Sequence, residues 1–248
     1  MKKIMFFILS IMSGIFLISC DNYKLPSSDI TEKEHYEIGD IIFADTSIVK
    51  EQELTELDDN NIPIAVIAGF KNDGTTLGIG VHRSDEPLPW TLENTLGYNT
   101  KFTNIISLQE TSVFVGDIDG SDNWNIICDE DNQDTINDAE NYPAFHFMNT
   151  YAQNYKLSDE YYYGWYIPSI EELNTIYQNR DAINSSLQKI YNMDNNAAMN
   201  GLGTNWYWSS SQANSDSESA WFMHYFNGYA GECPKNFTNL HVIVVHNF

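Results

Sequence analysis

The stretch Gly164–Leu173, which reads GWYIPSIEEL, contains the strongest local structural signal in the chain. Pro168 is followed by Ser169, and Glu172 comes three residues after that serine. Serine and glutamate at this spacing form a capping box, in which each side chain accepts a hydrogen bond from a backbone N–H that the first helical turn leaves free. The sequence therefore predicts a helix that starts directly after Pro168 and turns Leu173 toward the core.

Two further helices are expected on either side of this one. Within Ala139–Tyr155, large apolar residues recur at steps of three and four, which gathers them on one helical face. Pro143 fits only the first turn of a helix, so the regular helix is expected to start near it. A third, short helix carries Ile183, Leu187 and Ile190 at helical spacing.

Strands are expected on both sides of the helices. The segments with strand-like composition are 36–43, 62–70, 77–82, 206–211, 219–226 and 240–248. Residues 71–75 read KNDGT, and such residues between two strands favour a β-hairpin. Residues 84–135 are rich in Asp, Asn, Ser and Thr and are expected to form long ordered loops with short strands. This order of elements predicts an α+β fold with mostly antiparallel strands and two or three helices.

The composition excludes some classes of function. The chain has 248 residues, of which 42% are hydrophobic, so it can bury a real core. It contains 35 acidic residues against 12 Lys and Arg, which gives a formal net charge of −23. Such a charge repels phosphate backbones and anionic lipid headgroups, so we expect no nucleic-acid partner and no docking on a membrane by charge.

The first residues have the layout of a secretory signal. Lys2 and Lys3 precede the apolar run Ile4–Ile18, which is shorter than the roughly 20 residues of a membrane span. The run ends in LISC, which resembles a bacterial lipobox with Cys20 as the lipidated residue. The alternative is an ordinary secreted protein.

The lipobox interpretation divides the chain into a signal peptide at 1–19, a lipidated tether at 20–35 and a single domain at 36–248. Loss of the signal peptide removes two lysines and no acidic residue, which brings the net charge from −23 to −25. The expected location is the cell envelope, at the outer membrane or its periplasmic face. The expected membrane contact is the lipid on Cys20, since several acyl chains on one residue anchor a protein durably.

Three segments resemble the Lcl C-terminal domain family. Gly164–Leu173 is similar to the family's W-R-L-P-T-x-x-E-L segment. Trp206–Ser211 (WYWSSS) is similar to its Y-W-S-S-T strand, and Ala220–Gly228 (AWFMHYFNG) to its A-W-x-V-x-F-x-x-G strand. The resemblance implies a C-type-lectin-like fold, related to that of formylglycine-generating enzymes, with paired terminal strands. One named member of the family binds sulfated polysaccharide, a ligand that a charge of −25 disfavours here.

An acidic segment is the first candidate site. Asp117, Asp119 and Asp122 lie in GDIDGSDNW, where a glycine permits a sharp turn. Calcium prefers six to eight oxygen ligands, so these side chains are a candidate calcium site. The alternative is a turn in which the side chains cap their own backbone.

The two cysteines of the predicted domain are the second candidate site. In the oxidising envelope Cys128 and Cys233 could form a disulfide. Two free, buried thiols fit the sequence equally well.

Aromatic residues gather in the three family-like segments. A platform for sugar stacking is one interpretation, but the alternation along strands favours a role in the core. The set comprises Trp165, Trp206, Tyr207, Trp208, Trp221 and Tyr225. Tyr161–Tyr163 is a better candidate for an exposed contact, because three consecutive residues cannot share one face of a strand. His224, His241 and His246 have no spacing that requires a zinc site and are interpreted as structural.

Taken together, these features predict a lipid-anchored envelope protein with a non-catalytic, lectin-like domain that binds a glycan or a protein. One alternative is an oxidoreductase of the formylglycine-generating type that uses Cys128 and Cys233. Another is a purely structural or antigenic surface lipoprotein.

Overall fold

The computed structural model describes residues 36–248, which form one compact unit. The predicted signal peptide (1–19), the tether (20–35) and the lipidation site Cys20 lie outside the described residues. Among the residues that are described, none of the helices is both long and apolar enough to cross a membrane.

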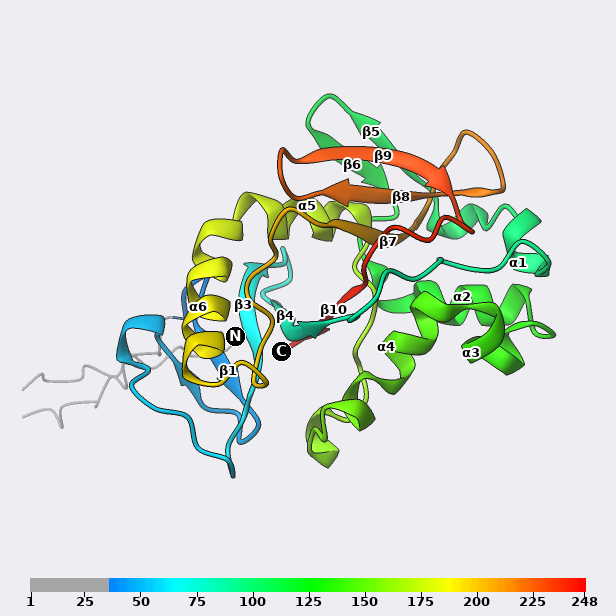
Figure 1. Cartoon of the computed structure of the whole chain (residues 1–248). Coiled ribbons are helices and arrows are strands. Elements are labelled where there is room, and N and C mark those ends of the chain that lie inside the picture. Colours follow the sequence, from blue (N-terminus) through cyan, green and yellow to red (C-terminus); the bar gives the residue numbers. More distant parts are fainter. Residues whose placement is uncertain (1–35) are drawn as a thin grey trace, which may run out of the picture. The chain divides into compact units, whose positions relative to one another are not determined.

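The ends of the described chain meet in one antiparallel sheet, with the strand order β10-β4-β3-β1-β2 (Figure 1). Its strands are β1 (Ile41–Phe43), β2 (Ile48–Val49), β3 (Pro63–Phe70), β4 (Thr76–Arg83) and β10 (Ile243–Asn247). The prediction that the terminal strands pair with each other is wrong in detail. The hairpin of β3 and β4 occupies the centre of the sheet, so β10 pairs with β4, while β1 pairs with β2 and β3.

The predicted β3–β4 hairpin is confirmed. Its turn closes with hydrogen bonds from the Lys71 N–H to the Thr75 carbonyl (2.8 Å) and from the Gly74 N–H to the Lys71 carbonyl (3.0 Å). Gly74 adopts a φ of +90°, which a residue with a side chain rarely tolerates. The strand composition on both sides and the glycine between them therefore specify this unit locally.

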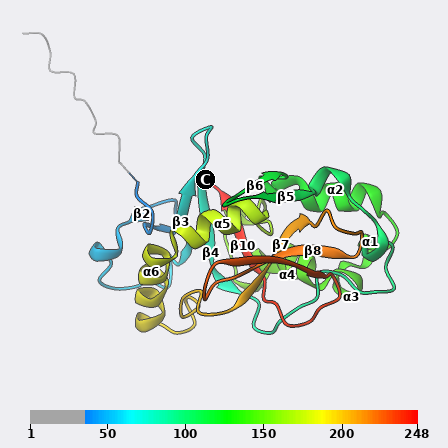
Figure 2. The same ribbon diagram turned by 90° about the horizontal axis from the view of Figure 1, so that it is seen from above.

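A second antiparallel sheet contains β7 (Trp206–Gln212), β8 (Ser219–His224) and β9 (Tyr229–Pro234), in that order. A separate hairpin consists of β5 (Ser107–Glu110) and β6 (Val113–Gly116). Isolated bridges join Tyr166 to Val245 and Tyr207 to His241, so β10 and the segment before it connect to both halves of the domain. The views in Figures 1 and 2 show the second sheet above one end of the first.

Residues 36–248 contain six α-helices rather than two or three. They are α1 (Leu96–Asn99), α2 (Asn123–Glu130), α3 (Asp138–Asn141), α4 (Pro143–Asn154), α5 (Ile170–Gln178) and α6 (Arg180–Met193). Short 3-10 turns occur at Glu51–Glu53, Thr103–Ile105, Gly120–Asp122, Thr135–Asn137 and Asp159–Tyr161. Mixed helices and antiparallel sheets confirm the predicted α+β class.

Both halves of the predicted capping box are present at the start of α5. The Ser169 hydroxyl accepts from the Glu172 N–H (3.2 Å), and a Glu172 carboxylate oxygen accepts from the Ser169 N–H (2.8 Å). Pro143 is the first residue of α4, as its fixed φ requires. The long expected helix of 139–155 is divided there into α3 and α4.

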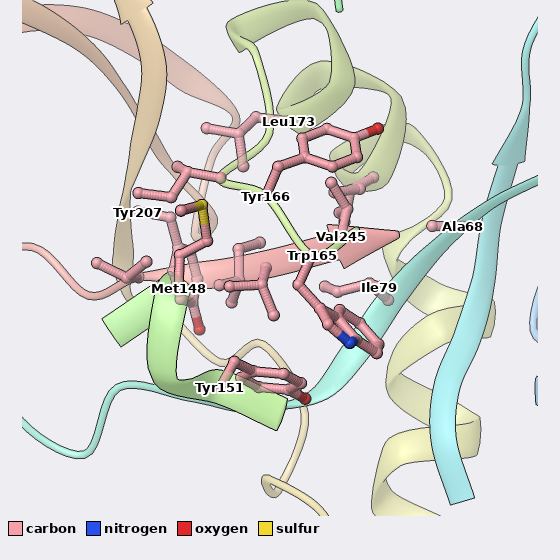
Figure 3. Packing of buried hydrophobic residues seen from close by; sticks show 14 of the residues in the cluster. Ala68, Ile79, Met148, Tyr151, Trp165, Tyr166, Leu173, Tyr207 and Val245 are labelled. Atoms are coloured by element: carbon pink, nitrogen blue, oxygen red, sulfur yellow. The ribbon is translucent and has the colours of Figure 1, made fainter. Parts of the chain in front are cut away.

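The aromatic side chains fill the core between the sheets and helices (Figure 3). Five of the six aromatic residues singled out in the sequence are buried: Trp165, Tyr207, Trp208, Trp221 and Tyr225. The buried indoles also find partners, since Trp208 donates to the Leu88 carbonyl (2.7 Å) and Trp221 to the Ser107 carbonyl (3.0 Å). The prediction of a core role is confirmed for these five, and Trp206 is the exception.

The core also encloses one lysine. Lys235, directly after β9, is fully buried, and its ammonium donates to the carbonyls of Gly97 (2.7 Å) and Thr100 (3.1 Å). It lies over the rings of Trp90 and Phe102, at 4.9 and 5.1 Å from their centroids. Burial lowers the pKa of Lys235 to about 7, against the attraction of nearby carboxylates.

This buried lysine predicts a rise in stability with pH. The ammonium has a pKa of 10.5 in the unfolded chain and about 7 in the folded one, so folding releases a proton between these values. Increasing pH in that window therefore favours the folded state, by at most about 1.4 kcal/mol per pH unit. Urea unfolding at pH 7.5, 8.5 and 9.5 should show this slope in the wild type and not in Lys235→Met. The Lys101→Met variant, which removes an exposed ammonium, serves as the control and should keep it; equal slopes in all three proteins would contradict the assignment.

Candidate functional site

A buried carboxylate joins three segments that lie far apart in the sequence. Glu172 Oε2 accepts the N–H groups of Ser169 (2.8 Å) and Gly120 (3.0 Å). Its Oε1 accepts the Tyr166 hydroxyl (2.7 Å) and lies 2.9 Å from the ammonium of Lys71. The capping-box glutamate therefore also holds the β3–β4 turn and the loop before α2.

Lys71 completes this cluster from the β3–β4 turn. Its ammonium also lies 3.1 Å from Asp119 Oδ1 and 3.1 Å from the Tyr166 hydroxyl. Burial acts to lower the pKa of Lys71, but the carboxylates of Glu172 and Asp119 outweigh it and raise that pKa. We call Lys71, Asp119, Tyr166 and Glu172 the Lys71 cluster.

A pocket of about 450 Å³ adjoins the Lys71 cluster. Besides three residues of the cluster, it is lined by Phe70, Leu77, Phe114, Ile118, Asp73 and Glu171, among others. The ammonium and carboxylates beside it bond to one another, to the Tyr166 hydroxyl and to two backbone N–H groups, and so tie distant segments of the chain together. The cluster is therefore a structural junction.

The predicted calcium ligands do not converge. Asp117 Oδ2 accepts from Asn123 Nδ2 (2.7 Å) and from the Ser211 hydroxyl (2.8 Å), and burial raises the pKa of Asp117 to about 6. Asp119 is paired with Lys71, and Asp122 precedes the first residue of α2. In the described part of the chain, no three His, Cys, Asp or Glu side chains are grouped to hold a metal ion. Asp117 and Asp119 bind protein donors instead.

Gly120 is needed for close approach rather than for a metal-binding turn. A β-carbon on Gly120 would lie 2.5 Å from the Ile167 carbonyl oxygen and 2.7 Å from the Ser169 nitrogen. The absent side chain lets the loop reach Glu172, to which the Gly120 N–H donates.

Of the two alternatives for Cys128 and Cys233, a disulfide or two free thiols, the structure has the two free thiols. Cys128 lies on α2 and Cys233 on β9, which belong to different layers of the domain. Burial raises the pKa of both thiols, that of Cys233 to about 12. Thiols with raised pKa values are poor nucleophiles, because the thiolate is the reactive form.

The three histidines singled out in the sequence lie beside backbone carbonyls. His224 Nε2 is 3.2 Å from the Thr204 oxygen, His241 Nδ1 is 2.9 Å from the Ser84 oxygen, and His246 Nε2 is 3.1 Å from the Tyr163 oxygen. In the tyrosine run, Tyr161 is buried, whereas Tyr162 and Tyr163 are exposed.

One end of the second sheet carries exposed aromatic rings. Trp206 lies parallel to Phe222, with 5.0 Å between centroids and 2° between planes, and 4.9 Å from the His224 ring. Tyr229 adjoins Phe222 (6.0 Å), and Phe226 adjoins His224 (6.0 Å). The exposed fractions are 36% for Trp206, 71% for Phe226 and 58% for Tyr229. We call Trp206, Phe222, His224, Phe226 and Tyr229 the aromatic surface.

Only part of the aromatic surface stands out in the sequence. Trp206 belonged to the aromatic set interpreted as core, and Phe226 and Tyr229 were not selected. Alternate residues of a strand lie on one face of the sheet, and this alternation could have indicated the aromatic surface. Cross-strand pairing sets Trp206 opposite His224 and His224 opposite Tyr229, on one face. Recognising it required the position of β9, which the sequence did not predict.

The chain was compared with known proteins. Neither a family model nor a curated protein matches it. Its structure is similar to the crystal structure of a fimbrial protein from Bacteroides ovatus, with a TM-score of 0.58 and 15% sequence identity. The similarity covers 86% of this chain and 49% of that chain, so this chain spans about half the length of the fimbrial protein. At this identity the likeness shows a shared fold, and the resemblance to the Lcl C-terminal domain family stays a prediction.

The Lys71 cluster predicts a steep loss of stability when Glu172 is removed. Glu172→Ala leaves the partly buried Lys71 ammonium without its nearest carboxylate and frees two buried backbone N–H groups, which should lower the free energy of unfolding by about 2–4 kcal/mol. Glu171→Ala is the matched control: its carboxylate accepts the Phe114 N–H (3.0 Å), a hydrogen bond whose loss costs about 1 kcal/mol. Urea unfolding at pH 7 measures both; a Glu172→Ala loss no larger than that of Glu171→Ala would refute the junction.

Proposed function

We propose that this protein is a lipid-anchored bacterial envelope protein whose domain, residues 36–248, is non-catalytic and binds a glycan or a protein. The aromatic surface is the observation that carries the binding proposal. Large rings that are exposed to water on a rigid sheet lower the free energy of the system when a ligand covers them. Contiguous exposed apolar patches therefore mark interaction sites.

The anchor and location rest mainly on the N-terminal sequence. The order of Lys2 and Lys3, the apolar run and Cys20 is that of a lipoprotein signal. The fold shared with a fimbrial protein adds support for a place at the cell surface.

The chemistry of the buried groups supports a binding role over an oxidoreductase. The formylglycine-generating alternative requires reactive thiols, and burial raises the pKa of Cys128 and Cys233. The Lys71 cluster, the densest group of charges described above, is satisfied internally.

The first functional prediction concerns the lipid anchor on Cys20. Cys20→Ser should abolish metabolic labelling with a radioactive fatty acid and move the protein from the membrane fraction to the soluble fraction, because the sulfur that carries the lipid is gone. Cys128→Ser is the matched control and should remain labelled and membrane-bound. A wild-type protein that takes up no fatty acid would refute the anchor.

The binding proposal is tested on glycan and protein arrays. The full chain, purified in detergent, should retain at least one ligand class, and the double variant Phe226→Ala/Tyr229→Ala should bind it at least about tenfold more weakly, as expected for two exposed contact rings. The control is Ile136→Ala/Leu96→Ala, which removes two side chains that are 84% and 54% exposed outside the aromatic surface.

Two outcomes would overturn the binding proposal. One is the absence of any retained ligand across both arrays, which would favour a structural or antigenic role. The other is an equal loss of binding in the control double variant, which would mean that the aromatic surface has no special part.

A further inference from the structure

Trp206 presents one face of its indole to solvent. Its ring is parallel to that of Phe222, which is 4% exposed, so the inner face of Trp206 is covered. The 36% of Trp206 that remains exposed comes from the part of its other face and edge that the neighbouring His224 ring, 4.9 Å away, leaves open. A flat ring supported from below offers a ligand a surface that does not have to be ordered on binding.

Tyr229 packs over a glycine on the same surface, with its ring inclined by 60° to that of Phe222. A β-carbon on Gly231 would lie 2.8 Å from Tyr229 Cε1 and 3.0 Å from Phe222 Cε1. The Tyr229 ring therefore crosses the bare backbone of Gly231 beside Phe222. Any other residue at position 231 would force these rings apart.

The two exposed rings stand in one row across the strands. Trp206 on β7 pairs with His224 on β8, and His224 pairs with Tyr229 on β9. Two strand spacings separate the backbones of Trp206 and Tyr229, about 10 Å. This separation is comparable with the length of two linked pyranose rings.

The aromatic surface carries little charge, although the protein carries a great deal. β7 and β8 contain no acidic, Lys or Arg residue, and the one carboxylate of β9, Glu232, pairs with Trp221 and so faces the opposite side of the sheet. The rest of the chain is strongly acidic and repels anionic polymers. The charge of the chain disfavours an anionic ligand, and the strands offer no carboxylate on this face to pair with a cationic one, so the arrangement favours an uncharged ligand.

Hydrogen-bonding groups border the rings. The Tyr229 hydroxyl and Asn227 Nδ2 have no partner among residues 36–248, while Asn227 Oδ1 accepts the Tyr229 N–H (3.1 Å). Phe226 projects from the turn between β8 and β9. Flat rings with donors at their edge suit a ligand with apolar faces and hydroxyl-bearing edges.

We infer that the aromatic surface is a stacking site for an uncharged polysaccharide that lies across the strands, with sugar units two apart in its chain stacked on the mutually inclined rings of Trp206 and Tyr229. This inference rests on the proposed binding function and names its ligand class. The polarised C–H groups of a pyranose face are attracted to the negative face of an aromatic ring. The sugar hydroxyls at the ring edges then meet the Tyr229 hydroxyl and the Asn227 amide.

The test uses affinity electrophoresis and titration calorimetry of the full chain in detergent. The probes are five neutral polysaccharides (mannan, xylan, dextran, galactan and a β-glucan) and two anionic ones, polygalacturonate and chondroitin sulfate. At least one neutral polysaccharide should bind, and both anionic ones should bind at least about tenfold more weakly. Trp206→Ala and Tyr229→Ala should each weaken the neutral interaction about tenfold or more.

Conservative variants separate stacking from a loss of folding. Trp206→Phe and Tyr229→Phe keep a flat ring and should retain most of the affinity, and Ile136→Ala removes an exposed apolar side chain elsewhere and should leave it unchanged. Bound polysaccharide should shift the tryptophan emission to shorter wavelength and protect it from acrylamide. This spectral change should disappear in Trp206→Phe although that variant still binds.

Failure of this inference is distinguishable from failure of the proposed function. If the wild type binds a protein through the aromatic surface but none of the five neutral polysaccharides, the inference is wrong and the proposed function stands. If a neutral polysaccharide binds equally well to Trp206→Ala, the stacking site is wrong. If nothing binds on any array, both are wrong.

Discussion

The carboxylate of Glu172 accepts hydrogen bonds from two backbone N–H groups and one hydroxyl and pairs with the ammonium of Lys71, and the arrangement of the domain depends on it. These donors come from the start of α5, the loop at Gly120, the segment before Pro168 and the turn of β3 and β4. A buried carboxylate is stable only when such donors surround it, because its desolvation costs several kcal/mol. The four segments must therefore assemble together, and a change at one of them is transmitted to the others.

The second sheet is attached to the same junction. The Tyr225 hydroxyl donates to the Leu173 carbonyl (2.9 Å) on α5, one residue after Glu172, and Trp221 donates to the β5 carbonyl of Ser107 (3.0 Å). These residues lie on the inner face of the sheet. Because that face is fixed by packing and hydrogen bonds, the rings on the outer face are held on a rigid support.

Local signals in the sequence were sufficient to predict some of the helices and strands. The capping box predicted α5, Pro143 predicted the start of α4, and KNDGT predicted the β3–β4 hairpin. Each of these depends on residues within a few positions of one another. By contrast, α2 (NWNIICDE) is only eight residues long and β9 (YAGECP) has an interrupted strand pattern, so both owe their conformation to packing against distant segments.

The candidate site was harder to predict for the same reason. Asp117, Asp119 and Asp122 look alike in the sequence, yet their partners come from different parts of the chain, including Lys71 and Ser211. Trp206 and Trp208 share one face of β7, but Trp208 is covered by the segment at Leu88 while Trp206 is not. Whether a strand residue is buried thus depends on which other segment of the chain covers it. The sequence pattern of the strand predicts only the face of the sheet on which the side chain lies.

The distribution of charge explains why exposed rings can persist on this protein. A patch with several large aromatic side chains favours self-association by burial of apolar area. Two copies of this chain, each with a net charge of −23, oppose that association by mutual repulsion at moderate ionic strength. The same field keeps anionic polymers away, yet it exerts no net force on an uncharged molecule. An acidic domain with an uncharged aromatic surface therefore selects against its own copies and against anionic ligands while leaving the rings open to a neutral one.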